Sequence, residues 1–85
     1  MNPEALSYAP QARRDLDLIL DQLLKAAGPL VADDYAIAFE TAFLRLGQFP
    51  LLGMKVPELG DSIRRWVVSP YIIIYTVDAL GLTVL

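Results

Sequence analysis

Residues 63–77, IRRWVVSPYIIIYTV, constrain the fold of this chain more than any other segment. Because β-branched and aromatic residues dominate it, the segment predicts a β-hairpin. The second arm, residues 71–77, is apolar at nearly every position, so it should lie inside a sheet with both faces covered. The N-terminal half must supply cover for one face, since it carries two strong helical patterns.

The first helical pattern starts at Pro10, which suits a first helical turn, and Gly28-Pro29 ends it. Its apolar residues recur at spacings of three and four, which places them on one face. They are Ala12, Leu16, Ile19, Leu20, Leu23 and Ala27.

A second helix is expected to begin near Leu30 to Asp33, with Asp33 and Asp34 in its first turn. It should stop at Gln48-Phe49-Pro50, because proline disfavours helical geometry in the preceding residue. A connection this short makes the two helices antiparallel. The predicted buried stripe of the second helix is Ala32, Ala36, Phe39, Phe43 and Leu46.

The remaining segments predict the rest of a sheet. Residues 5–9 could pair as a strand, residues 51–61 indicate an irregular connection, and residues 82–85 begin a strand after a turn. An apolar final strand without a polar cap would leave an exposed, aggregation-prone edge, which natural sheets avoid. We therefore expect this polypeptide to be a shortened form of a longer chain. Residues 1–85 are thus predicted to form one α+β domain, an N-terminal antiparallel helical hairpin packed on a three- to four-stranded antiparallel β-sheet.

Composition argues against several classes of function. The chain has no cysteine and no histidine, which removes disulfides, thiolate chemistry, the commonest metal ligand and the usual proton-transfer group. A net charge of -3 disfavours direct binding to nucleic acid. The longest apolar runs fall short of the roughly 20 residues that span a bilayer, and the N-terminus has no signal-peptide pattern. We expect a cytoplasmic protein with no cofactor, no metal and no membrane partner.

Several short motifs follow one another along the chain. They are residues 12–16 (ARRDL), Phe49-Pro50, Leu52-Gly53, residues 56–60 (VPELG), residues 63–65 (IRR) and residues 70–78 (PYIIIYTVD). Together, and in this order, they resemble the ParE branch of the RelE/ParE toxin superfamily. The resemblance implies the toxin of a type II toxin–antitoxin system, which inhibits DNA gyrase by binding. It also implies a hetero-oligomer with a cognate ParD-like antitoxin, through which alone nucleic acid is contacted.

RelE relatives instead cut messenger RNA on the ribosome, and they place an arginine directly after the tyrosine that opens the central strand. Here that position is Ile72, and of the basic set only Arg65 remains. No catalytic residue is therefore expected. Thr76 also stands where arginine is common in ParE relatives. The alternatives are a RelE-like ribosome-dependent endonuclease and a non-toxic remnant that only binds antitoxin.

Candidate partner-binding residues share a charge or an aromatic ring at a predicted surface. They are Arg64, Arg65, Trp66, Tyr71, Tyr75, Arg13 and Arg14. Arg64 and Arg65 could each hold a carboxylate, but neighbours on a strand point to opposite faces, so at most one joins any site. Their alternative role is an edge-strand charge that blocks aggregation.

The other candidates also have structural alternatives. Trp66 could pack in the core, the tyrosines could keep one polar tip wet, and the helical arginines could belong to a solvated face. A hydrophobic content of 55% exceeds what one small core can hide. We therefore expect a sheet face or helix groove to stay open for an antitoxin segment, either extended or helical.

Overall fold

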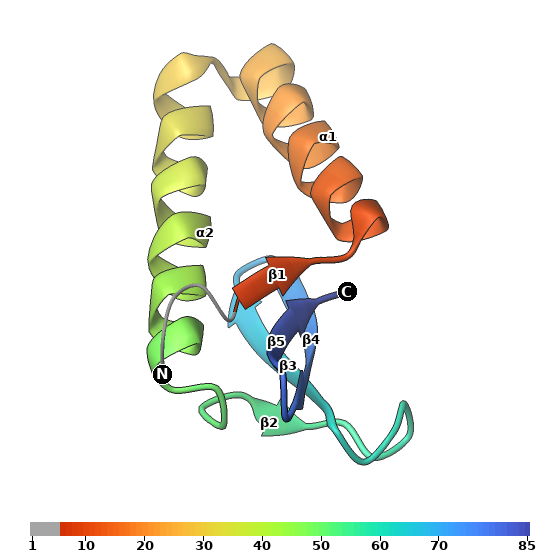
Figure 1. Ribbon diagram of the computed structural model, residues 1–85. Helices are drawn as coiled ribbons and strands as arrows, with labels where there is room; N and C mark the ends of the chain where they lie inside the picture. Colours follow the sequence, from red (N-terminus) through yellow and green to blue (C-terminus); the bar gives the residue numbers. More distant parts are fainter. Residues whose placement is uncertain (1–5) are drawn as a thin grey trace.

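Seven elements follow one another in residues 6–85, which are the residues that this computed structural model describes. They are β1 (Leu6–Tyr8), α1 (Pro10–Ala27), α2 (Pro29–Gln48), β2 (Met54–Lys55), β3 (Ile63–Val68), β4 (Tyr71–Asp78) and β5 (Gly81–Val84). Figure 1 shows the two helices running in opposite directions on the same side of the sheet. The predicted α+β architecture and helical hairpin are thereby confirmed.

A single residue, Gly28, joins the two helices. Gly28 has a φ of 91°, which glycine adopts with little strain because it has no Cβ atom. Its N–H donates a hydrogen bond to the Leu24 carbonyl oxygen at 3.0 Å. The second helix begins at Pro29, earlier than predicted, because the fixed φ of proline suits a first helical position. Asp33 and Asp34 consequently lie in the second turn, so the prediction that they occupy the first turn is wrong.

The sheet has the order β1-β5-β4-β3-β2. The strand pair β1 and β5 is parallel, and the other pairs are antiparallel. The predicted antiparallel sheet of three or four strands is therefore corrected to a mixed sheet of five within residues 6–85. A parallel pair needs a crossover connection, and the chain between β1 and β5 provides it. The Ser7 Oγ and Thr83 Oγ1 atoms lie 3.1 Å apart across this pair.

Two further sequence predictions concern segments that form edge strands of the sheet. The strand expected within residues 5–9 is present as β1, while Ala5 lies outside the described residues. The connection expected to be irregular over residues 51–61 contains the short strand β2. Because β2 pairs with Arg64 and Arg65 of β3, these arginines do not stand on a free edge, so the alternative in which they are edge-strand charges is wrong.

The core lies between the helices and one face of the sheet. The middle strand is β4, as predicted, and its alternate residues Ile73 and Tyr75 are buried there. Aromatic rings of α2 pack on this face: Phe39 lies 5.7 Å from Tyr71 between ring centroids. Most members of the two predicted helical stripes are buried or half-buried, but Ala27 is exposed. The other buried hydrophobic residues are Ala12, Ala32, Ala42, Phe43, Leu46, Leu82 and Val84.

The opposite face of β4 is not covered. Ile72 is 53% exposed, although it is flanked in sequence by half-buried Tyr71 and buried Ile73. The prediction that both faces of this strand are covered is therefore wrong. The physical reason is that both described helices lie on one side, so alternate side chains of β4 point away from them.

Candidate functional site

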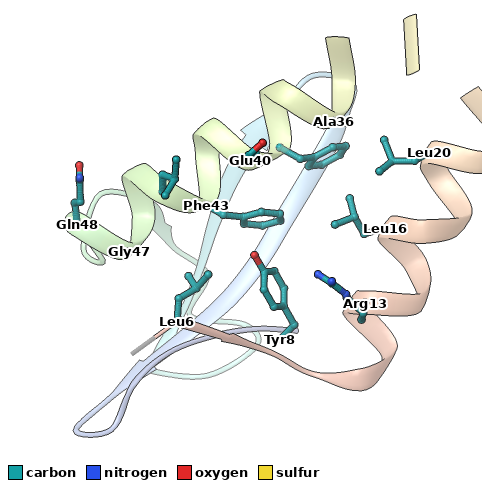
Figure 2. A pocket seen from close by; sticks show the side chains of 12 residues that line it. Leu6, Tyr8, Arg13, Leu16, Leu20, Ala36, Glu40, Phe43, Gly47 and Gln48 are labelled. Atoms are coloured by element: carbon teal, nitrogen blue, oxygen red, sulfur yellow. The ribbon is translucent and has the colours of Figure 1, made fainter. Parts of the chain in front are cut away.

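An apolar groove opens between α1 and α2 above β1 (Figure 2). Its volume is about 300 Å³. We call it the interhelical groove. It is lined by Leu6, Tyr8, Arg13, Leu16, Leu20, Ala36, Phe39, Glu40, Phe43, Leu44, Gly47 and Gln48.

Helical periodicity explains which side chains reach the groove. The α1 residues Arg13, Leu16 and Leu20 are three or four positions apart, so they share one helix face. The lining residues of α2 follow the same spacing. Gly47 lines the groove at a point where a Cβ atom would meet no other atom within 4 Å, so the space beside it is open. The groove is therefore a consequence of two apolar helix faces that diverge above the sheet.

Tyr8 forms the floor of the groove. Its ring meets Phe43 edge to face, with 5.2 Å between the ring centroids, and the Arg13 guanidinium carbon lies 5.3 Å from the centroid of the Tyr8 ring. Burial raises the pKa of the Tyr8 hydroxyl; the Arg13 charge lowers this pKa and the Glu40 charge raises it. The floor is thus neutral at physiological pH, between one cation and one anion.

A second polar cluster joins β3 and β4 to the loop after α2. The Tyr75 hydroxyl accepts a hydrogen bond from the Gly53 N–H and donates one to the Pro50 carbonyl oxygen, both at 2.8 Å. Arg64 Nη1 donates to the carbonyl oxygens of Gly53 at 2.7 Å and Leu51 at 3.0 Å. Tyr75 and Arg64 face each other across the strand pair. The two side chains therefore hold residues 50–53 against the sheet.

The close approach at this cluster requires glycine. A Cβ atom on Gly53 would collide with the Tyr75 hydroxyl and would lie 2.6 Å from the Arg65 carbonyl oxygen. Burial raises the pKa of the Tyr75 hydroxyl, while the hydrogen bond from Gly53 and the charge of Arg64 lower it. The Tyr75 side chain is fully buried, so in this conformation its role is to anchor the loop.

Arg65 has a different environment from Arg64. It is exposed on the face away from the helices, and its Nη2 atom lies 3.9 Å from the Met54 sulfur. The sequence argument that adjacent arginines serve different faces agrees with this placement.

The remaining candidates lie apart from one another. Trp66 is half-buried and packs against the core, as its structural alternative predicted. Tyr71 is half-buried, with its ring edge-on to Tyr35 at 5.7 Å. Arg14 is exposed, and its Nη2 atom donates to Gln11 Oε1 at 3.2 Å. The predicted residues do not form one site, and their contact with a partner stays a prediction.

Sequence reasoning missed most of the interhelical groove. Only Arg13 among the predicted binding residues lines it. The helical spacing places Phe43 in the core, and it gives no reason to choose Tyr8 or Leu44 as binding residues. One sequence signal for the groove was available. Leu44 is apolar and lies directly beside the predicted buried stripe of the second helix, so the apolar surface of that helix is wider than a single packing contact can cover.

Some chemistry has no support in residues 6–85. No group of three or more acidic side chains there is arranged to hold a metal ion. In the same part of the chain, neither helix combines the length and the apolar character that a membrane crossing requires.

Comparison with known proteins identifies the family. The family model described as the ParE toxin of the type II toxin–antitoxin system parDE matches residues 6–85. Curated protein sequences gave no match to this chain. The family match includes both helices and all five strands described above. The chain therefore belongs to the ParE toxin family of type II toxin–antitoxin systems.

Proposed function

We propose that this toxin inhibits DNA gyrase by binding to it, without catalysing a reaction, and that a cognate antitoxin neutralises it by occupying the interhelical groove. Family membership supports the toxin and its antitoxin partner. The groove supports the proposed mode of neutralisation, because it is concave, mostly apolar and bordered by opposite charges. The resulting complex is a hetero-oligomer in the cytoplasm.

The polar groups of the sheet support a binding role. Cleavage of RNA needs a proton acceptor, donors to the phosphate and an acid for the leaving group. The Tyr75 hydroxyl is occupied by two backbone partners, and Arg64 is bound to two carbonyl oxygens. Arg65 stands among apolar residues on the other face. Among the residues that the structure describes, these three side chains do not converge on one point, which supports a binding role over RNA cleavage.

The lining of the groove, which is mostly apolar with one cation and one anion, favours an amphipathic segment of the antitoxin. A helix or strand that places apolar side chains against Leu16, Leu20 and Phe43 would bury them. Arg13 and Glu40 can pair with charges on that segment and so fix its direction. Leu44 at the groove wall is 58% exposed, which leaves apolar area for the partner to cover.

A supercoiling assay tests the proposed target. Purified toxin added to gyrase and relaxed plasmid should stop supercoiling, and an excess of antitoxin should restore it. The same toxin should leave messages intact during translation in vitro. Codon-dependent cleavage of those messages, with supercoiling unaffected, contradicts the proposal and favours the RelE-like alternative.

A pair of matched variants tests the groove. Leu44→Asp places a charge on the groove wall and should weaken antitoxin binding about ten-fold or more, since roughly 1.4 kcal/mol corresponds to ten-fold in affinity. Leu18→Asp is the control, because Leu18 is 55% exposed on α1 and does not line the groove. Isothermal titration with the antitoxin measures both affinities. Equal affinities for the two variants would remove the groove from the proposal.

A further inference from the structure

The sheet face turned away from the helices carries a second apolar surface. Strand register places Arg65 between Met54 of β2 and Ile74 of β4, and it places Val67 opposite Ile72. We call these five residues the open face. Met54 is 65% exposed, Val67 54% and Ile72 53%. Apolar side chains are thus grouped on neighbouring strands and stay accessible to a partner.

Arg65 is the charged member of the open face. In residues 6–85 the acid–base pair within 4.0 Å is Lys25 with Asp21, and Arg65 makes no such pair. Its guanidinium instead lies near the Met54 sulfur. A hollow of about 210 Å³ lies beside it, lined by Met54, Arg65, Trp66 and Val67. A guanidinium fork within an apolar surface is complementary to a carboxylate on an apolar partner.

We propose that the open face is the surface through which this toxin contacts its protein target. The target segment would place apolar side chains over Val67 and Ile72 and a carboxylate against Arg65. This inference rests on the proposed function, in which that target is gyrase and the antitoxin takes the interhelical groove. The open face and the interhelical groove lie on opposite sides of the sheet. The target and the antitoxin would therefore bind at two separate sites.

The charge of the open face favours a protein target over two other binding partners, nucleic acid and a second copy of the chain. Nucleic acid needs several cations to neutralise successive phosphates, and the open face offers one. A second copy of the chain would meet this face through the same five residues, which bring Arg65 toward Arg65 without a carboxylate among them. A protein surface that supplies an acidic residue matches the charge and the apolar area together.

The test compares open-face variants with a control in two assays. Arg65→Glu reverses the charge, and Ile72→Thr removes apolar area while keeping a β-branched side chain suited to a strand. Leu18→Asp is the control, on an exposed α1 position of similar accessibility. Each purified variant is titrated against gyrase in the supercoiling assay, and its affinity for the antitoxin is measured separately. Retained antitoxin affinity also shows that the variant is folded.

The expected result is a loss of gyrase inhibition of about ten-fold or more for Arg65→Glu and several-fold for Ile72→Thr, with antitoxin affinity unchanged. Inhibition equal to wild type in both variants overturns the assignment. A parallel loss of antitoxin affinity also overturns it, because the face would then belong to the antitoxin. So does a change of oligomeric state in Arg65→Glu, measured by sedimentation, because it would indicate a second copy. If the wild-type chain leaves gyrase unaffected, the proposed function itself fails, and this assignment falls with it.

Discussion

The two faces of β4 use similar residues for opposite purposes. Ile73 and Tyr75 point toward the helices and are buried, whereas Ile72 between Tyr71 and Ile73 is more than half exposed. Both sets are apolar and β-branched or aromatic, so side-chain type does not decide burial. The position of the helices decides it. A strand that is apolar on both faces therefore does not by itself predict that its own chain covers both of them.

The strongest test of the difference between the two faces of β4 replaces two neighbouring isoleucines by alanine. Ile73→Ala removes methyl groups from the core and should lower the free energy of unfolding by about 2–4 kcal/mol. Ile72→Ala removes the same groups from the open face and should cost less than about 1 kcal/mol in the isolated chain. Urea denaturation measures both. Equal losses would show that the open face is covered in solution.

Two neighbouring hydroxyls make the next comparison. Tyr75→Phe leaves the Gly53 N–H and the Pro50 carbonyl oxygen without their buried partner, so it should cost about 1–3 kcal/mol. Thr76→Val removes a hydroxyl whose bond to Ser62 is exposed, and it should change stability by less than about 0.5 kcal/mol. Thermal unfolding followed by circular dichroism separates these values. Similar melting temperatures would mean that residues 50–53 are not held by Tyr75.

The adjacent arginines offer a comparison of smaller size. Arg64→Ala removes the donor to two loop carbonyl oxygens and should lower stability by about 1–2 kcal/mol. Arg65→Ala should leave stability within about 0.5 kcal/mol, because its side chain is exposed and its Nη2 atom lies 3.9 Å from a weak acceptor, the Met54 sulfur. Chemical denaturation of both variants provides the measurement. A larger loss for Arg65 would reverse the assignment of the two side chains to structure and to surface.

The smallest expected effect is a pH dependence confined to the helix-facing side. The folded-state pKa values of Tyr8 and Tyr75 are raised above 10.0, chiefly by burial, so the unfolded chain binds fewer protons above that pH. Stability from these two groups is fully present below pH 10.0 and is lost as pH rises through the folded pKa values. Denaturation from about pH 9 to pH 11 should give a shallower decline for Tyr8→Phe than for wild type. An unchanged slope would contradict the burial of that hydroxyl.

Local patterns predicted the elements well because their causes are local. Pro10 and Gly28-Pro29 set the bounds of α1 through backbone geometry, and the spacing of Phe39 and Phe43 identified the buried face of α2. The hairpin of β3 and β4 followed from residue type. The parallel pairing of β1 with β5 could not be predicted in this way. The three residues of β1 have no local sequence pattern that identifies β5 as their partner strand.

The candidate sites were harder to predict because they depend on distances between elements. Arg64 and Arg65 differ by one sequence position and belong to different environments, which strand alternation indicated correctly. The bonds from Arg64 to the loop depend on where residues 50–53 fold back, and sequence spacing does not give that. The interhelical groove depends on how far α1 and α2 diverge. The angle between two helices follows from side-chain packing along both, so it leaves no short motif.

The pairing of β1 with β5 also sets an order of assembly. Tyr8 comes before both helices in the sequence, whereas its strand partner Val84 comes after them. Contacts so distant along the chain form late, because the intervening loop must close before they contribute free energy. Both helices can therefore form before the pairing of β1 with β5 fixes Tyr8 at the floor of the groove. A partner that binds the groove against Tyr8 is therefore expected to bind the chain only after β5 has paired with β1.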